Sequence, residues 1–168
     1  MYETDSSPLY EVELKEVCDG FQVPKHVIRA REDVRICDSL GRGEFGEVYK
    51  GYLDTDATTR FEIAIKEAQS HEAREMLEEA KAMIRVTKHE HIVNFQGICI
   101  DGDRVYLLLE FCSNGSIQSY MWKKNEQFLE ELKEQKFSTL LRWCVEVAKG
   151  MDFLASEHII HVSKIGIT

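Results

Sequence analysis

The sequence predicts an α+β fold with two parts: a five-stranded antiparallel sheet that carries one helix, followed by helices alone. Segments with the two-residue alternation of strands lie between residues 34 and 111, and one segment with helical spacing interrupts them. Beyond residue 116 only helical spacing occurs. The length of 168 residues and the hydrophobic share of 43% suit a soluble globular chain of about one domain.

The charge balance argues against a role in nucleic-acid binding. The chain has 21 Lys and Arg against 30 Asp and Glu, a net charge of −9, whereas phosphate contacts need clustered basic side chains. No apolar run approaches the roughly 20 residues that span a bilayer. The acidic start MYETDSSPLYEVEL has no signal-peptide pattern. We therefore expect a cytoplasmic chain.

The cysteines and histidines form no metal or disulfide framework. The five cysteines are odd in number and include no C-x-x-C pair, so we expect reduced thiols. His89 and His91 lie beside an apolar run, as do His158 and His161, without acidic or thiol partners at ligand spacing. We expect structural or surface histidines and no metal site.

Residues 1–33 show no sustained period and contain both prolines of the chain. This pattern predicts a largely extended leader. Tyr2 and Tyr10 lie among acidic residues there. They are either solvated side chains of a tail or phosphorylation sites.

Five segments have the composition of strands. Residues 34–53, VRICDSLGRGEFGEVYKGYL, carry β-branched and aromatic residues on both sides of a glycine cluster, which predicts two strands joined by a glycine-rich turn. FEIAIK at residues 61–66 predicts a third strand. HIVNFQGICI and DRVYLLLEF, separated by the turn Asp101–Asp103, predict the last two.

Residues 70–88, SHEAREMLEEAKAMIRVTK, switch to helical spacing. Ser70 suits the N-cap position, and Glu72 and Glu75 suit the positive end of the helix dipole. One stripe of apolar and small residues would face the sheet: Ala73, Met76, Leu77, Ala80, Ile84 and Thr87.

The remainder of the chain predicts helices. IQSYMWKK at residues 117–124 suits a short helix, and Ser138–Leu154 suits a long one. The long helix is apolar on more than one face, so we expect exposed apolar area and a poorly soluble chain. Its apolar residues are Leu140, Leu141, Val145, Val147, Ala148, Met151 and Leu154.

Gly41, Gly43 and Gly46 form the pattern G-x-G-x-x-G, which occurs in dinucleotide-binding folds and in kinases. In a dinucleotide-binding fold a helix begins at the third glycine, but here a strand pattern, EVYKGYL, follows it. The glycines therefore predict a hairpin that covers phosphates with backbone N–H groups, because a side chain would block the approach. A purely structural hairpin turn is the alternative.

Lys66 ends the string AIK, twenty residues after the last of these glycines. In the strand-lysine motif of kinases, the ammonium pairs with the α- and β-phosphates of ATP and with a helix glutamate. Glu79 lies on the flank of the apolar stripe and can face Lys66. Glu75 and Glu78 are its rivals for this role.

From Val34 to His161 the chain resembles the protein kinase fold and, more closely, the tyrosine kinases. The strings that carry the resemblance are LGRGEFGEVYKG, AIK, MLEEAKAM, HEHIVNFQGIC, LLLEFCSNGSIQSYM and AKGMDFLASEHIIH. The last two and IVNFQG look most like receptor tyrosine kinases of the vascular endothelial, platelet-derived and fibroblast growth factor receptor group. The resemblance implies a juxtamembrane-like leader at 1–33, a kinase N-lobe with its hinge at 34–112, a partial helical C-lobe at 113–161 and an off-family tail at 162–168.

The resemblance also implies a nucleotide site. Leu109 falls at the gatekeeper position behind adenine, and the hinge Glu110-Phe111-Cys112 follows it. Met83 and Phe95 match positions whose packing holds the helix inward. Lys66 and Glu79 would form the catalytic ion pair. The residues implied to bind ATP are Leu40, Gly41, Gly43, Phe45, Gly46, Val48, Ala64, Lys66, Leu109, Glu110 and Cys112.

The sequence departs from the family at the catalytic loop. His161 matches the first residue of H-R-D, but Val162 and Ser163 stand where Arg and Asp belong, and no D-F-G follows. A complete family member would use Mg²⁺ and transfer the γ-phosphate of ATP to protein tyrosine in receptor-type signalling. We expect that this chain is truncated before the catalytic loop, lacks the protein ligands of Mg²⁺ and is inactive alone. The alternative is a non-catalytic truncated isoform that acts as a binding or regulatory module.

The resemblance also implies partners and a location. Protein substrates or signalling partners are expected. Attachment to the cytoplasmic side of the plasma membrane, in a full-length form, is implied by the resemblance to receptor kinases alone.

Overall fold

The computed structural model describes residues 23–43, 46–56, 58–69, 72–86, 88–123 and 137–159. The chain forms two compact units. The first contains the chain up to Ile84 together with Asn94–Phe111, and the second contains Arg85–Val93 together with the chain from Cys112 onward.

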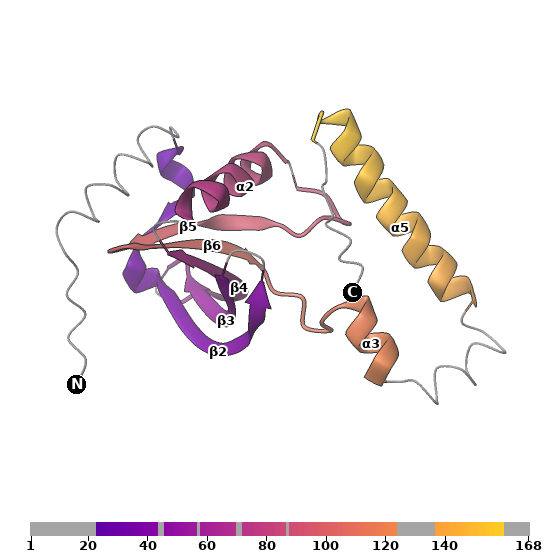
Figure 1. Ribbon diagram of the computed structural model, residues 1–168, viewed down its shortest axis with the longest axis horizontal. Helices are drawn as coiled ribbons and strands as arrows, with labels where there is room; N and C mark the ends of the chain where they lie inside the picture. Colours follow the sequence, from indigo (N-terminus) through magenta and orange to yellow (C-terminus); the bar gives the residue numbers. More distant parts are fainter. Residues whose placement is uncertain are drawn as a thin grey trace. The chain divides into compact units, whose positions relative to one another are not determined.

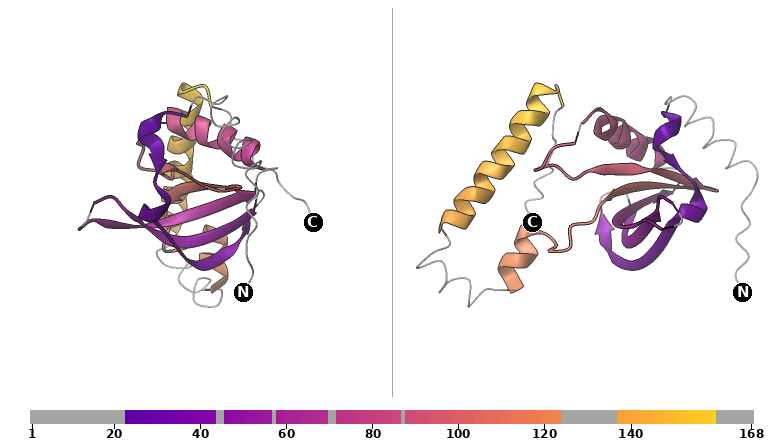
Figure 2. Two further views of the ribbon diagram at one scale, coloured as in Figure 1. Left: turned by 90° about the vertical axis from the view of Figure 1, so that its left-hand side faces the viewer. Right: turned by 180° about the vertical axis from the view of Figure 1, so that it is seen from behind.

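The first unit is built on a six-stranded sheet with the strand order β1-β5-β6-β4-β3-β2 (Figure 1). Strands β2 to β6 correspond to the five predicted strands, and their pairs are antiparallel. The sixth strand, β1, pairs in parallel with β5. Strands β2, β3 and β4 curl (Figure 2). The strands are β1 (Ile28–Arg29), β2 (Val34–Gly43), β3 (Gly46–Asp54), β4 (Arg60–Gln69), β5 (Phe95–Asp101) and β6 (Arg104–Glu110).

Strand β1 belongs to residues 1–33, for which the sequence predicts a largely extended leader. Two short 3-10 helices, η1 (Lys25–Val27) and η2 (Arg31–Asp33), flank this strand. Arg29 Nε donates a hydrogen bond to the backbone oxygen of Gln96 at 3.0 Å, and Arg31 Nε donates one to Asp101 Oδ2 at 2.8 Å. The leader therefore closes the β5 edge of the sheet, and the predicted total of five strands is one too few.

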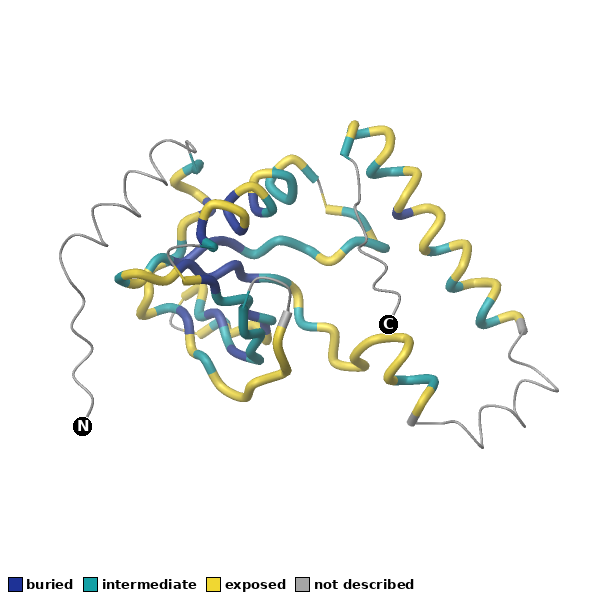
Figure 3. Tube along the Cα trace, in the orientation of Figure 1, coloured by how far each residue is buried: buried dark blue, intermediate teal, exposed yellow. Residues whose placement is uncertain are grey.

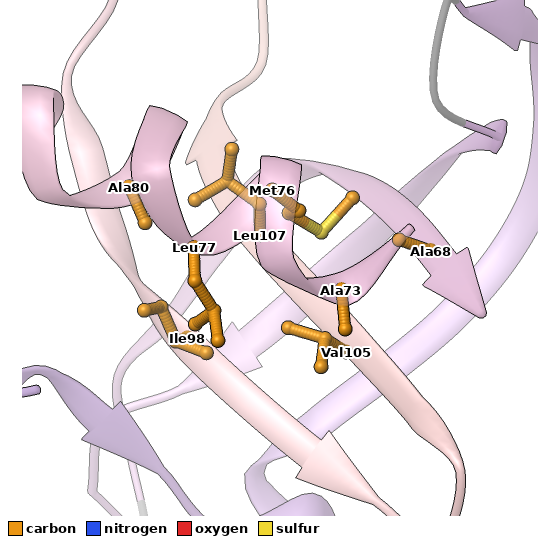
Figure 4. Packing of buried hydrophobic residues seen from close by; sticks show 8 residues of the cluster. All are labelled: Ala68, Ala73, Met76, Leu77, Ala80, Ile98, Val105 and Leu107. Carbon is orange, nitrogen blue, oxygen red and sulfur yellow. The ribbon is translucent and has the colours of Figure 1, made fainter. Parts of the chain in front are cut away.

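Helix α2 (Ala73–Arg85) covers one face of the sheet. Its buried residues follow the predicted stripe, Ile84 is partly buried, and Ser70 and Thr87 lie outside the described residues. Met83 and Phe95 pack, partly buried, against the same cluster. Figure 4 shows the eight buried residues of this cluster, which are Ala68, Ala73, Met76, Leu77, Ala80, Ile98, Val105 and Leu107.

A second cluster lies on the opposite face of the sheet. Because side chains alternate along a strand, Ile63 and Ile65 of β4 point away from α2 while Ala68 points toward it. Buried positions accordingly concentrate in the sheet and on α2 (Figure 3). The cluster consists of Val34, Leu53, Ile63, Ile65, Cys99, Tyr106 and Leu108. These two clusters make the sheet a rigid support for the residues at its surface.

The second unit contains the helices α3 (Ile117–Lys123) and α5 (Phe137–Ser156). The N–H of Ser119 donates to Ser116 Oγ at 3.0 Å, which caps α3. The ring of His89 stacks on Phe153 of α5 with centroids 4.6 Å apart, and the rings of Tyr120 and Trp143 meet edge to face. His89 thus has a packing role.

Several sequence predictions fall partly or wholly outside the described residues. Tyr2, Tyr10, Cys18 and His161 are among the residues that the structure leaves undescribed. Among the described cysteines, Cys37, Cys99, Cys112 and Cys144 are free. None of the described helices combines the length and the apolar character that a membrane crossing requires.

Candidate functional site

Lys66 and Glu79 form an ion pair between β4 and α2. Lys66 Nζ lies 2.5 Å from Glu79 Oε2, and the two side chains are 15% and 33% exposed. Partial burial lowers the effective dielectric constant around the pair, so the attraction is stronger than between solvated surface charges. Among the three predicted rivals the structure brings Glu79 to Lys66, whereas Glu75 and Glu78 are exposed.

The position of this pair follows from the packing of α2 on the sheet. Lys66 lies on the same face of β4 as Ala68, which is buried under α2. Glu79 precedes Ala80, which is buried in the same cluster, so its carboxylate emerges at the margin of the helix–sheet contact. The ammonium of Lys66 therefore lies at the edge of the part of the sheet that α2 covers.

Beyond Lys66, three apolar side chains on the same face of the sheet are only partly covered. Val48 is paired with Lys66 across β3 and β4, and Ala64 is paired with Leu109 across β4 and β6. Directly paired residues point to the same side of a sheet. Val48, Ala64 and Leu109 therefore share one face, and each is intermediate in burial.

The glycine-rich hairpin joins β2 to β3 next to this face. Gly41 is paired with Val48 and Gly43 with Gly46. Gly41 and Gly46 have φ angles of +138° and +135°, which favour glycine. A Cβ atom at Gly46 would lie 2.0 Å from the backbone oxygen of Glu67, so the hairpin needs glycine there for space as well. Leu40 is 50% exposed, and Phe45 lies outside the described residues.

The end of β6 is tied to the residue that precedes β5. Glu110 N donates to the backbone oxygen of Asn94 at 2.9 Å. Asn94 Nδ2 donates in turn to Glu110 Oε2 at 2.6 Å, and Asn94 N donates to the same oxygen at 3.1 Å. These bonds hold the first residue of the predicted hinge from both its backbone and its side chain. Cys112 is exposed and belongs to the second unit.

Lys50 of β3 contacts the next hinge residue, Phe111. Its Nζ lies 4.8 Å from the centroid of the Phe111 ring and 2.7 Å from Glu62 Oε1. The hydrogen bond with Glu62 raises the pKa of Lys50, and the same bond lowers the pKa of Glu62. The ammonium is therefore charged at neutral pH. Sequence reasoning missed Lys50 and Asn94, although the strand register places Lys50 opposite Ala64.

Other charged groups among the described residues form ion pairs and hydrogen bonds within the fold. No group of three described His, Cys, Asp or Glu residues could hold a metal ion. A surface pocket at the β3–β4 turn includes Arg35, Asp54 and Arg60, whose charges pair with one another. Asp56 accepts hydrogen bonds from the backbone and hydroxyl of Thr58, which lower its pKa to about 2.

Known proteins with similar sequences include kinases. The family model described as protein tyrosine and serine/threonine kinase matches residues 34–163. The protein sevenless of Drosophila virilis is 36% identical over 125 residues, which covers 73% of this chain and 5% of that protein. The human tyrosine-protein kinase Fer is 33% identical over 141 residues, covering 82% of this chain and 16% of Fer.

A third relative is a receptor by name. The melanoma receptor tyrosine-protein kinase of Xiphophorus maculatus is 35% identical over 127 residues, covering 73% of this chain and 10% of that protein. The chain thus spans between 5% and 16% of the length of these relatives. The matched part includes strands β2 to β6, helix α2 and the long helix α5.

Proposed function

Since this chain belongs to the protein tyrosine kinase family, we propose that its first unit binds ATP beside α2, on the part of the same face of the sheet that the helix leaves uncovered. The observation that carries the proposal is the Lys66–Glu79 ion pair at the edge of that face. A partly buried cation beside an apolar surface suits a ligand with a planar base at one end and phosphates at the other.

The base would lie at the apolar end of the site. Val48 and Ala64 supply one wall, and Leu109 limits the depth of the site behind the base. Apolar walls suit a planar ring because they leave no donor or acceptor unpaired. The backbone groups of Glu110 and Cys112 would supply hydrogen bonds to the edge of the base.

The phosphates would lie between Lys66 and the glycine-rich hairpin. Lys66 would bind the α- and β-phosphate oxygens, and Glu79 keeps its ammonium oriented toward them. The backbone N–H groups of the glycine-rich segment, to which Phe45 belongs, would donate to the phosphates. Leu40 would join Val48 and Ala64 in lining the faces of the base.

Mg²⁺ accompanies ATP in the kinase family and neutralises the charge of the transferred phosphoryl group. The described residues bring together no group that fits this ion. We therefore assign it no ligand here and give it no part in the binding mode.

We further propose that the complete protein transfers the γ-phosphate of ATP to protein tyrosine, and that this chain alone does not. The transfer needs a carboxylate that accepts the proton of the substrate hydroxyl. Ser163 occupies the position where the family motif places that Asp. A serine hydroxyl cannot accept the proton at neutral pH without a base of its own.

Partners and location extend the same proposal. The complete protein would act on protein substrates and signalling partners, and a receptor-type member would work at the cytoplasmic side of the plasma membrane. A second candidate function is a binding module that holds nucleotide or protein partners without turnover. The preserved Lys66–Glu79 pair, together with a serine at position 163 of the sequence, favours that candidate for the chain taken alone.

Nucleotide binding is tested by titration calorimetry of ATP with the 168-residue chain. Lys66→Met should weaken ATP binding by about tenfold or more, because a charge-assisted hydrogen bond contributes about 1.5–3 kcal/mol. Lys149→Met removes an exposed lysine of α5 and should leave the affinity unchanged. Equal affinities of the parent chain and Lys66→Met would exclude the proposed phosphate contact.

Catalysis is tested separately with ATP labelled at the γ-phosphate and a tyrosine-containing polymer. We expect no transfer of label. Transfer that disappears in Lys66→Met would show that the chain is an active kinase and would overturn the proposal of inactivity.

A further inference from the structure

We propose that Lys50 is a positioning residue of the base-binding strip, which we define as residues 110–112. This inference rests on the proposed function and adds a residue that the kinase motifs do not supply. Lys50 would act through Phe111, whose ring it contacts, and would not touch the nucleotide.

The strand register places Lys50 beside this strip. Lys50 is paired with Ala64, and Ala64 is paired with Leu109. All three side chains therefore stand on the same face of the sheet. Ala64 is the smallest of the three, so the stem of Lys50 can extend across β4 toward the end of β6.

Glu62 directs the ammonium of Lys50. Tyr52 is paired with Glu62 across β3 and β4, and continuing the β4–β6 register by one step sets Glu62 opposite Phe111. Glu62 Oε1 lies 2.7 Å from Lys50 Nζ. The Glu62 carboxylate thus holds the Lys50 ammonium near Phe111.

The contact with Phe111 is a cation–π interaction. Lys50 Nζ lies 4.8 Å from the ring centroid, inside the range of about 6 Å in which such contacts are attractive. Only 26% of the Lys50 side chain is exposed, so the contact is partly shielded from solvent. Lys50 contacts the ring from the side of the sheet. By favouring one orientation of the ring, this contact would restrict the torsions of Phe111.

This restriction bears on ligand binding because Phe111 lies between the two residues whose peptide groups would meet the base. Glu110 is already fixed by Asn94. Without the Lys50 contact, residues 111–112 would be less ordered before the ligand binds. Ordering them on binding would then cost part of the binding free energy. The apolar walls and the phosphate-binding residues would be unaffected.

The test compares Lys50→Met, which keeps an unbranched side chain and removes the charge, with Lys50→Arg, which keeps the charge. Adenosine, ATP and inorganic tripolyphosphate are the probes, with binding to the 168-residue chain measured by calorimetry. Lys50→Met should weaken adenosine and ATP by about three- to tenfold, the range expected for one cation–π contact. Tripolyphosphate binding should not change, and Lys50→Arg should restore the adenosine affinity.

Two variants serve as matched controls. Tyr52→Phe removes the hydroxyl that donates to Glu62 at 3.4 Å and keeps the ring beside Lys50, so it should behave like the parent chain. Lys149→Met removes one positive charge at an exposed site of α5 and measures the effect of net charge alone.

Amide hydrogen exchange gives a readout that needs no nucleotide. In Lys50→Met the amides of residues 111–112 should exchange severalfold faster, while those of β4 keep the parent rate. Unchanged exchange and unchanged adenosine affinity in Lys50→Met would overturn the proposal. Equal weakening of adenosine and tripolyphosphate would overturn it too, because a general loss of charge or fold would then explain the result.

The outcomes also separate this proposal from the proposed function. If the parent chain bound none of the three probes, the ATP proposal would fall and the base-positioning role would fall with it. If the parent chain bound ATP and Lys50→Met bound adenosine and ATP as tightly as the parent chain, the ATP proposal would stand. Only the positioning role of Lys50 would then be lost.

Discussion

At the scale of single residues, Gly46 carries a sharp steric constraint of the candidate site. Its φ of +135° is unfavourable for other residues, and an added Cβ would meet the backbone oxygen of Glu67 at 2.0 Å. Gly46 is paired with Gly43 of β2 and Glu67 with Tyr106 of β6, so moving either backbone would disturb a strand pair. Gly46→Ala should therefore lower the free energy of unfolding by at least about 1–3 kcal/mol, measured by urea denaturation.

Gly41→Ala is the matched control for this prediction. Gly41 has nearly the same φ, +138°, but nothing lies within 4 Å of the position that an added Cβ would take. The control carries the torsional strain without the collision, so it should destabilise the chain less than Gly46→Ala. Equal losses in the two variants would show that the contact with Glu67 contributes nothing.

Residue-scale prediction from the sequence succeeds where spacing alone decides and fails where packing decides. Spacing favours Glu79, on the flank of the apolar stripe of α2, but it leaves Glu75 and Glu78 as rivals. The packing of α2 on the sheet brings Glu79 to Lys66. The contact between Lys50 and Phe111 joins residues far apart in the chain, and it depends on a strand register that the pattern does not reveal.

At the scale of elements, helix α2 depends on its buried face. Leu77 is 1% exposed and packs in the cluster that joins α2 to β5 and β6. Leu77→Ala should lower the free energy of unfolding by about 2–5 kcal/mol, because it removes buried methyl groups and leaves a cavity. Urea denaturation followed by circular dichroism would measure the loss.

Arg74→Ala is the control on the same helix, because Arg74 is exposed. It should change the free energy of unfolding by less than about 0.5 kcal/mol. A similar small change for Leu77→Ala would mean that α2 does not pack on the sheet as described.

The elements themselves differ in how far the sequence predicts them. Strands β2 to β6 each carry the alternation that comes from having one buried face, and α2 carries a helical stripe for the same reason. Strand β1 has two residues and is held by hydrogen bonds of Arg29 and its backbone to β5. Two residues cannot show a period, so the pattern misses this strand.

At the scale of the whole molecule, the two units differ in how their apolar residues are covered. The first unit buries clusters on both faces of its sheet. In the second unit, helix α5 exposes Leu141, Val145, Val147 and Met151 by 44% to 57%. Leu141 and Val145 lie one turn apart on α5, as do Val147 and Met151 on another side, and exposed apolar surface of this kind favours association.

This contrast predicts that the chain associates through α5. Val147→Glu combined with Met151→Glu should lower the average mass measured by light scattering, because it replaces exposed apolar area with charge. Lys149→Glu is the matched control: it changes the net charge by the same −2 units on the same helix and removes no apolar side chain. If the control lowered the mass equally, net charge and not the apolar surface would govern association. A parent chain that is monomeric and unfolds cooperatively would contradict the prediction outright, since the exposed residues of α5 would then be tolerated in water.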